Sequence, residues 1–466
     1  MSENLTKAQE LGVLDIKKLL FQYALPAIIA MTASSLYNMV DSIFIGQGVG
    51  ALAISGLAVT FPLINLTTAF GTLVGVGAAS LTSILLGQKN YRMASRVLGN
   101  VMTMNVTLGV GIGVIALLFL DPILCFFGAS EQTIGYARDY MIVILLGNVF
   151  THLYFGLNAM LRAAGHPRRA MRATILTVCL NAVLDPIFIF VLDWGIQGAA
   201  IATVLAQVVS LVWQLRIFSD RSELLHFDKG VFCMDVDIAK RSLSIGLAPF
   251  LMNTASCFVV LFINQQLKHF GGDLAIGAYG IVNRVVFLFV MIVMGFTQGM
   301  QPIAGYNYGA RMYDRVMKVL KYTIICGTAV MTAGFLLSQL CPRIIVSAFT
   351  KDVELIRLAT EGFKITMLVA PVVGAQIVIS NFFQSIGLVG RSIFMSLSRQ
   401  LLFLLPCLAI LPLFFGQNGV WYSLPVSDFI AAIVAFVLLM QVIRKFRREM
   451  AAQKQEKETT NNLQTR

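Results

Sequence analysis

Twelve long apolar runs divide this chain of 466 residues, and each is long enough to cross a bilayer as a helix of roughly 20 residues or more. Charged residues make up only 12% of the chain, about half the share in soluble domains. Lipid offers the backbone no hydrogen-bond partners, so such runs predict helices, and the alternation typical of a β-barrel is absent. We therefore expect an all-α integral membrane protein with twelve transmembrane helices. The runs lie near 19–45, 53–86, 97–120, 134–161, 171–192, 195–217, 242–267, 274–305, 316–341, 355–387, 392–414 and 419–443.

Lys and Arg gather in every second connection between these runs. Arg92 and Arg96 follow the second run, Arg311 and Arg315 follow the eighth, and a basic tail follows the last. The connections after runs one, five and eleven carry neither residue type. This pattern predicts that both termini are cytoplasmic. The net charge of +12 is then a feature of topology and does not indicate nucleic-acid binding. The first run is too long for the apolar part of a signal peptide, so we expect a retained helix.

The second half of the chain repeats the first. Six helices per half bring both halves into the membrane in the same sense, which predicts two six-helix bundles related by a pseudo-two-fold axis along the membrane normal. We expect an N-terminal segment at 1–18, a first lobe at 19–218, a linker at 219–241, a second lobe at 242–443 and a tail at 444–466. The matched positions, at offsets between 219 and 223, are Arg92-x-x-x-Arg96 with Arg311-x-x-x-Arg315, Gly165-x-x-x-Arg169 with Gly387-x-x-x-Arg391, Pro26 with Pro249, and Gly195-x-x-Gly198 with Gly416-x-x-Gly419.

Two aspartates stand inside or at the edge of apolar runs of the first lobe. Asp41 and Asp185 have no acidic counterparts in the second half, and an acid in a bilayer usually marks an ion or substrate pathway. Asn181 lies one helical turn before Asp185, on the same face. Topology places Thr203, on the sixth helix, at a similar depth. Carboxylate, amide and hydroxyl oxygens suit a hard cation such as Na⁺, and two close carboxylates equally suit a proton, so we expect a cation-coupling site here.

Structural roles for these residues remain open. Asp41 could end its helix at the external interface, Asp185 precedes a proline and could mark a helix break, and Asn181 with Thr203 could join helices. Pro26 and Pro186 each remove a backbone hydrogen bond and are candidate hinges.

Other polar and adaptable side chains are candidates for holding a transported molecule. Tyr37 and Asn38 lie one turn before Asp41, and Asn158 lies in the fourth run. Gln298 and Met300 belong to a Met-rich eighth run, and Met adapts to varied apolar shapes, although such a helix also suits ordinary packing.

Several catalytic motifs are absent. The chain contains no GxxxxGK[ST] phosphate loop, no HExxH and no GxSxG, which argues against a built-in ATPase and against an intramembrane enzyme. We expect no enzyme activity and no cofactor beyond a coupling ion, which leaves a secondary transporter driven by an ion gradient.

The chain resembles the MATE (multidrug and toxic compound extrusion) transporters along nearly its whole length. The residues that carry the resemblance are Pro26, Asn38-Met-Val-Asp41-Ser-Ile-Phe-Ile-Gly46, Gly165, Asn181-x-x-x-Asp185-Pro186 and Gly198-Ala-Ala-Ile-Ala-Thr203. Acids confined to the first lobe are similar to the prokaryotic DinF/MepA-like branch. The resemblance implies a V-shaped pair of bundles working by alternating access, a cation site at the positions of Asp41, Asn181, Asp185 and Thr203, and a drug chamber near Tyr37 and Asn158.

Added to the ion-coupled transporter that the residues predict, the resemblance implies a secondary multidrug exporter in the bacterial inner membrane. It would exchange bulky, often cationic and aromatic compounds for H⁺ or Na⁺, contact membrane lipid, bind no nucleic acid and act as a monomer. A flippase for lipid-linked or polar lipid precursors is the main alternative, although its cavity should be strongly basic. A receptor or channel without coupled transport is a third alternative, which the duplicated lobes disfavour.

Overall fold

The structure is a computed structural model that describes residues 7–227 and 234–464. These residues are almost entirely helical, and none of them forms a strand. The helices are α1 (Lys7–Val13), α2 (Ile16–Gly48), α3 (Ala51–Gly87), α4 (Tyr91–Leu118), α5 (Leu120–Phe126), α6 (Ile134–Leu146), α7 (Asn148–Ala163), α8 (Pro167–Pro186), η1 (Ile187–Val191), α9 (Gly195–Ser219), α10 (Val236–Gly309), α11 (Tyr313–Leu340), α12 (Pro342–Ser347), α13 (Val353–Thr366), α14 (Ala370–Ser385), α15 (Val389–Leu397), η2 (Ser398–Leu404), α16 (Leu405–Phe415) and α17 (Gln417–Gln464).

Twelve membrane spans arise from these helices. Ten are single apolar stretches, and two are pairs of helices bent by 56° (α6 with α7) and 58° (α13 with α14) at short breaks. The long α10 provides two of the ten, because its backbone breaks at Gly272, where φ is 71° and ψ is −169°. A non-glycine residue is strained at such a φ. The twelve spans fall where the apolar runs predicted them.

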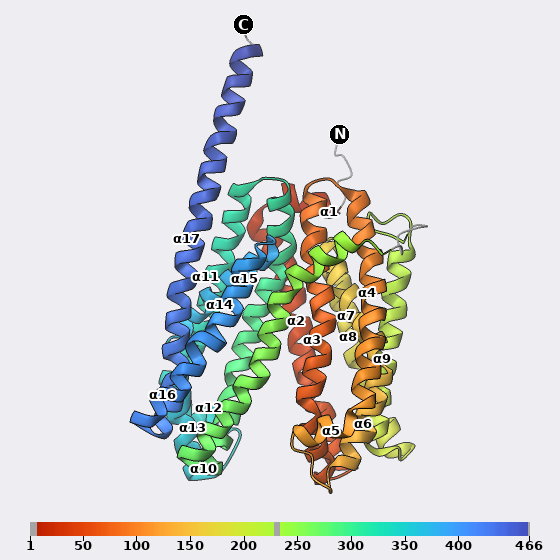
Figure 1. The fold of residues 1–466 in the computed structure, drawn as a ribbon, viewed down its shortest axis with the longest axis vertical. Coiled ribbons are helices and arrows are strands. Elements are labelled where there is room, and N and C mark those ends of the chain that lie inside the picture. The colour runs from red at the N-terminus through yellow and green to blue at the C-terminus, as the bar shows by residue number, and fades with distance from the viewer. Residues whose placement is uncertain (1–6, 228–233, 465–466) are drawn as a thin grey trace.

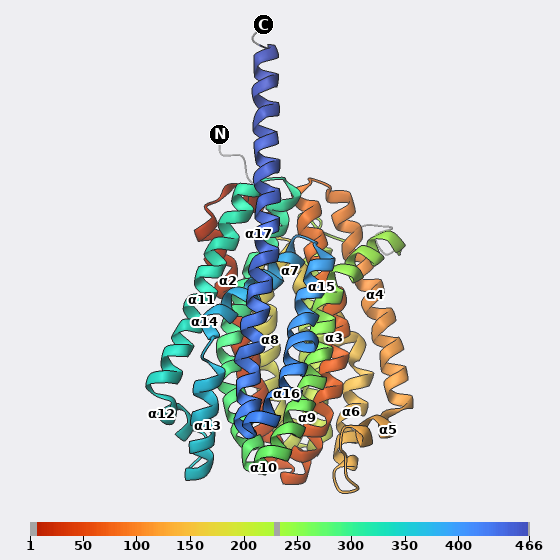
Figure 2. The same ribbon diagram turned by 60° about the vertical axis from the view of Figure 1, so that its left-hand side comes forward.

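The spans form two six-helix bundles, the first from α2 to α9 and the second from α10 to α17 (Figure 1). The chain termini lie at the same end of the molecule, and the last turns of α17 project beyond that end (Figures 1 and 2). At the opposite end, where α5, α6, α12 and α13 lie, the two bundles diverge (Figure 1). The predicted all-α, two-bundle fold is therefore confirmed.

The backbone conformation repeats between the two lobes, as the sequence does. Eight of the ten described residues with a positive φ form pairs at offsets of 221 or 222, each at the corresponding connection of its lobe, and Gly128 and Asp193 have no such counterpart. Each lobe also carries a π-helix in its fifth span, η1 in the first lobe and η2 in the second. Positive φ is unusual for residues other than glycine, so this coincidence shows that the two lobes share one backbone plan. The pairs are Gly50 (113°) with Gly272 (71°), Lys89 (59°) with Arg311 (56°), Gly165 (93°) with Gly387 (73°), and Gly195 (55°) with Gly416 (57°).

Glycines let the lobes touch backbone to backbone in the half of the molecule that carries the termini. A Cβ on Gly246 would lie 1.8 Å from the Leu73 carbonyl oxygen, and a Cβ on Gly77 would lie 2.0 Å from the carbonyl oxygen of Ser242. No side chain fits at such distances. The first half of α10 is thereby pressed against α3 of the other lobe.

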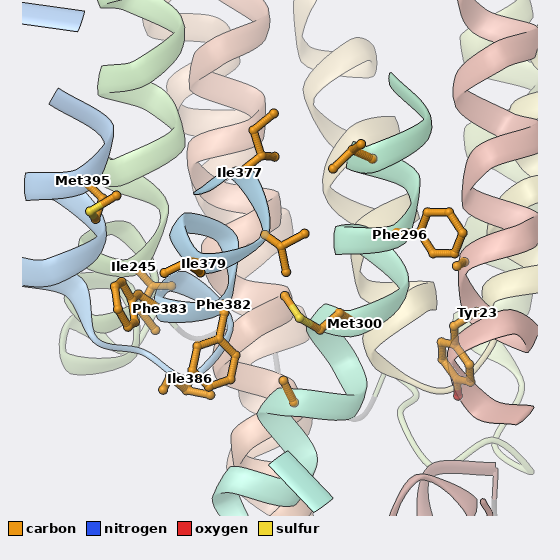
Figure 3. Close-up of a cluster of buried hydrophobic side chains, with 14 of the residues drawn as sticks. Tyr23, Ile245, Phe296, Met300, Ile377, Ile379, Phe382, Phe383, Ile386 and Met395 are labelled. Carbon is orange, nitrogen blue, oxygen red and sulfur yellow. The ribbon is translucent and has the colours of Figure 1, made fainter. Parts of the chain in front are cut away.

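Apolar side chains continue this contact as a buried core. Figure 3 shows Met300 of α10 near Phe382 of α14, and Phe296 of α10 on the side of α2, the helix of the other lobe that carries Tyr23. Met300 and Phe382 are fully buried. In the half of the molecule that carries the termini, the two lobes therefore share one packed core.

Candidate cation-coupling site

Three helices of the first lobe bring the four predicted coupling residues together. Asp41 comes from α2, Asn181 and Asp185 from α8, and Thr203 from α9. Asp185 is completely buried, Asn181 is 1% exposed and Asp41 is 7% exposed. Asp41 therefore lies inside the lobe and not at an interfacial helix end, since α2 continues to Gly48.

Hydrogen bonds fix the polar edge of this site. The Asn181 side-chain amide donates to the Thr203 hydroxyl at 3.2 Å, and the Tyr37 and Thr203 hydroxyls are hydrogen-bonded at 3.0 Å. These bonds turn the Asn181 nitrogen toward α9. Tyr37, predicted as a substrate residue, is thus also part of the wall of the cation site.

The remaining oxygens of the site are buried acceptors. Asp41 and Asp185 lie close enough to interact, and Asn181 lies beside Asp185. However, one oxygen of Asp41, the Asn181 carbonyl oxygen and both oxygens of Asp185 receive no hydrogen bond from the described residues. Buried polar atoms are normally paired, because an unpaired one costs desolvation free energy. Four buried oxygens with no donor form an arrangement that a proton or a small hard cation would complete.

Tyr140 of α6 is a further member of this site that sequence reasoning missed. Its side chain is 5% exposed and interacts with Asp41, Asp185 and Thr203. Tyr140 lies six residues from the start of α6, or about 9 Å into the membrane from the outer end at 1.5 Å per residue. The depth argument that placed Thr203 would have found Tyr140 as well.

Asn158 belongs to a separate polar cluster. Its amide donates to the Ala170 carbonyl oxygen at 3.0 Å and to the Thr174 hydroxyl at 3.3 Å, and it accepts a hydrogen bond from Arg162. Thr174 precedes Asp185 by eleven residues on α8, about 16 Å along the axis. The structure therefore places Asn158 toward the end of the molecule that carries the chain termini, apart from Asp41 and Asp185.

The other predicted substrate residues lie elsewhere. Gln298 of α10 contacts α2 through its amide, 3.4 Å from the Met31 sulfur, and Met300 lies in the packed core described above. Asn38 belongs to α2, but its side chain falls outside the part of the chain that the structure describes. Substrate contact by these residues stays a prediction.

The two candidate hinges have different surroundings. Helix α2 runs without interruption through Pro26, and the residues on either side of it pack against the other lobe, with Ala24 against Gly299 and Ile28 against Gly295. Pro186 ends α8, and the chain continues as the π-helix η1. Each proline leaves one carbonyl group without its helical donor, which makes bending at that turn less costly.

The second lobe carries an ion pair in its membrane region. Arg399 of η2 donates to Asp428 of α17 at 2.7 Å. A carboxylate with its own cation is neutralised in place, which distinguishes Asp428 from the two aspartates of the first lobe.

The fold and this site define a class of protein, a twelve-span membrane transporter with two matched lobes and acidic groups buried in one of them. The MatE family model matches residues 26–187 and 245–409. The multidrug export protein MepA of Staphylococcus haemolyticus is 31% identical, with the match covering 91% of this chain and 93% of that protein. MepA of Staphylococcus aureus is 29% identical over the same shares.

Solved structures give the same answer. The MATE multidrug transporter DinF-BH superimposes with a TM-score of 0.85 at 36% identity, over 91% of this chain and 95% of that chain. A MATE family transporter in an outward-facing conformation gives a TM-score of 0.89 at 24% identity, which shows the shared fold. The chain belongs to the MatE family.

Proposed function

We propose that this protein exports bulky, often cationic drugs across the cytoplasmic membrane in exchange for H⁺ or Na⁺. The observation that carries the proposal is the set of four buried oxygens on Asp41, Asn181 and Asp185 that lack donors. The names of the relatives support the choice of cargo, because MepA is a multidrug export protein and DinF-BH is a multidrug transporter.

The geometry supports coupling through α2. A cation bound between Asp41 and Asp185 cancels their mutual repulsion and draws α2 toward α8. The turn at Pro26 is where α2 bends most readily, and Ala24 and Ile28 on either side of it contact the other lobe. Cation binding would thereby change the inner wall of the first lobe and the contact between the lobes together, which alternating access requires.

The orientation completes the proposal. The lobes are packed together at the end with the termini and diverge at the other end (Figure 1). With the termini in the cytoplasm, as the positive-inside pattern predicts, this is an outward-facing arrangement that takes up the coupling ion and releases the drug outside.

Efflux from proteoliposomes tests both drug export and its coupling to a cation through the carboxylates. We expect ethidium transport to respond to an imposed proton gradient or to an imposed Na⁺ gradient, each applied separately. We expect Asp41→Asn and Asp185→Asn to abolish this response, because an amide neither takes up a proton in this range nor neutralises a cation.

Asp193→Asn is the matched control. Asp193 is an exposed residue just beyond η1 at a φ of 52°, a conformation that Asn also tolerates. It should transport at the parental rate. If Asp41→Asn and Asp185→Asn both keep the parental, gradient-dependent rate, the carboxylate mechanism is wrong. If the parental protein moves no drug under either gradient, drug antiport itself is wrong.

A further inference from the structure

A cavity on the outer surface of the first lobe has no role in the proposed transport. It has a volume of about 390 Å³ and lies between the ends of α4, α5 and α6. These ends lie opposite the termini (Figure 1), which is the external side in the orientation that the positive-inside pattern predicts. We call this cavity the outer notch, and its lining residues are Leu117, Leu118, Leu120, Asp121, Pro122, Arg138, Ile142 and Leu146.

The outer notch is polar at one end and apolar along its length. Arg138, Ile142 and Leu146 recur every four residues and share one face of α6. They extend the notch by about 12 Å along the helix, at 1.5 Å per residue. Leu146 is 66% exposed and Leu118 is 73% exposed. Exposed leucines at this depth face lipid, so the long part of the notch faces the bilayer.

The same helix faces the protein interior with its other side. Tyr140, two residues after Arg138, is buried against the cation site. The outer notch is therefore on the back of α6, separated from the carboxylates by the helix itself, and a molecule in it would come from the membrane.

Arg138 and Asp121 form an ion pair at the polar end of the outer notch, and both side chains keep hydrogen-bonding groups that this pair does not use. The Arg138 Nε and Nη2 atoms donate to the two Asp121 oxygens at 2.8 Å and 2.7 Å. The Nη1 group is not engaged in this pair, and each Asp121 oxygen keeps an unused lone pair. Both side chains are almost half exposed. A guanidinium held in this way presents its free edge to a phosphate.

The charge at this end selects among headgroups. The charge of Asp139, the next residue on α6, also acts on Arg138, so two carboxylates lie in the neighbourhood of one guanidinium. The polar end of the outer notch therefore carries a net negative charge, which would repel a purely anionic headgroup. A headgroup with a phosphate for Arg138 and an ammonium for Asp121 matches both signs at once.

We propose that the outer notch binds a phospholipid with a zwitterionic, primary-amine headgroup. Its phosphate lies on Arg138, its ammonium lies on Asp121, and one acyl chain follows Ile142 and Leu146 toward the membrane centre. The amine matters because its N–H groups hydrogen-bond to a carboxylate, which a trimethylammonium group cannot do.

The second lobe supplies the control. Arg357 on α13 stands 219 residues after Arg138, at the equivalent place in the repeat. However, it pairs with Glu354 and Glu361 of its own helix and does not bridge to a neighbouring helix. Removing Arg357 therefore removes the same charge at the same depth without opening a bridge between helices.

Native mass spectrometry of the purified full chain, titrated with single lipids, tests the proposal. Phosphatidylethanolamine, phosphatidylcholine and phosphatidylglycerol are the three probes. We expect the first phosphatidylethanolamine to bind most tightly, and Arg138→Gln to weaken it by about two- to fivefold, the upper part of the range for one exposed charge pair. Arg357→Gln should leave that affinity unchanged. Asp121→Asn should shift the preference toward phosphatidylglycerol, because the polar end loses a negative charge.

A second variant tests the apolar part without touching the ion pair. Leu146→Trp fills the notch from an exposed position and should remove the preference for phosphatidylethanolamine in a normally folded protein. Leu368→Trp, on an exposed residue at the matching break of the second lobe, should not. The proposal is overturned if Arg138→Gln and Arg357→Gln weaken lipid binding equally, or if the parental protein binds the three lipids equally well.

Discussion

Gly87 and Gly309 occupy equivalent positions in the two lobes, and each packs against the backbone of the opposite lobe. A Cβ on Gly87 would lie 1.9 Å from the Tyr306 carbonyl oxygen, and a Cβ on Gly309 would lie 2.0 Å from that of Ile84. Both glycines and both carbonyl groups are 222 residues apart, so the contact obeys the internal pseudo-two-fold axis. The end of the molecule that carries the termini is thus closed by two symmetry-related contacts that only glycine permits.

Gly309→Ala should therefore push the lobes apart at this end. Overpacking of this kind costs roughly 1–3 kcal/mol, and the protein can avoid the cost by opening the contact. Because 1.4 kcal/mol corresponds to a tenfold change in an equilibrium constant, the ratio of the closed to the open arrangement should fall about tenfold. Distances between spin labels on α3 and α11 would record the change.

Gly111→Ala is the control for this experiment. Gly111 lies within α4, and a Cβ there would meet no atom within 4 Å. It should leave the label distances unchanged. Equal distances in Gly309→Ala and in the parental protein would contradict a contact that only glycine permits.

Arg315 ties the short helix α1 to the second lobe at the same end. It donates to the carbonyl oxygens of Leu11 and Leu14 at 3.0 Å and 2.7 Å, and to the Asn307 side chain at 2.8 Å. Asn307 adds its own bond to Leu11 at 3.0 Å. Carbonyl groups at a helix end have no partner within the helix, so these donors satisfy groups that would otherwise be unpaired.

Arg315→Ala should release α1. Hydrogen bonds to a charged group contribute about 1.5–3 kcal/mol, so the detached form should become at least tenfold more populated. Tryptic cleavage at Lys17 and Lys18 should accelerate accordingly. Lys318→Ala, on an exposed residue of the same helix, serves as the control. Cleavage at the parental rate in Arg315→Ala would show that other contacts hold α1.

Much of this architecture could be predicted from the sequence because membrane spans have a simple physical signature. The apolar runs predicted twelve spans because the length of a spanning helix is set by the bilayer. The repeat predicted two bundles because matched positions recur along the sequence itself. Asn181 and Asp185 could be placed on one face because helical spacing is regular. Depth then added Thr203 from another helix.

Other features depend on geometry that no local pattern records. The contact of Gly87 with Tyr306 joins residues more than 200 positions apart, and it follows from how two helices cross. Helices α6 and α7 meet at a bend of 56°, and this angle cannot be read from Gly147 alone. Met300 looked adaptable in the sequence, whereas its complete burial follows from packing between α10 and α14.

Thr203 offers a precise test of the cation site, because its hydroxyl joins Tyr37 to Asn181. Thr203→Val keeps the shape and removes both bonds, which leaves the Asn181 amide without its acceptor. Each neutral bond contributes about 1 kcal/mol, so the loss of both should raise the ion concentration at half-maximal efflux by up to about thirtyfold. Thr203→Ser restores the hydroxyl and should recover most of the parental response. A Val variant with parental ion dependence would exclude a coupling role for Thr203.

The linker between the lobes is fastened by Glu223, and this contact predicts a pH dependence. Glu223 accepts from Arg169 at 2.5 Å and lies 2.8 Å from the His166 ring nitrogen. Burial alone would raise the pKa of Glu223, but the hydrogen bond from Arg169 and the charges of His166 and Arg169 outweigh it and hold the pKa below its ordinary value of 4.5. A carboxyl group whose pKa is lowered by folding stabilises the folded state above its ordinary pKa, and this stabilisation disappears as the pH falls through the lowered value.

Glu223→Gln isolates that contribution, because it removes the charge and keeps the shape. At pH 7 we expect the parental protein to have the higher thermal unfolding midpoint in detergent. The difference between the two proteins should shrink once the pH drops below about 4.5 and vanish where the parental carboxyl group is protonated, because both then carry a neutral side chain. Other acidic groups titrate alike in both proteins and cancel from the difference. Protonation of His166 below pH 7 can first widen the gap, so the decisive window lies below pH 4.5, where a gap that stays constant or widens down to pH 3 would mean that Glu223 acts through its shape and not through its charge.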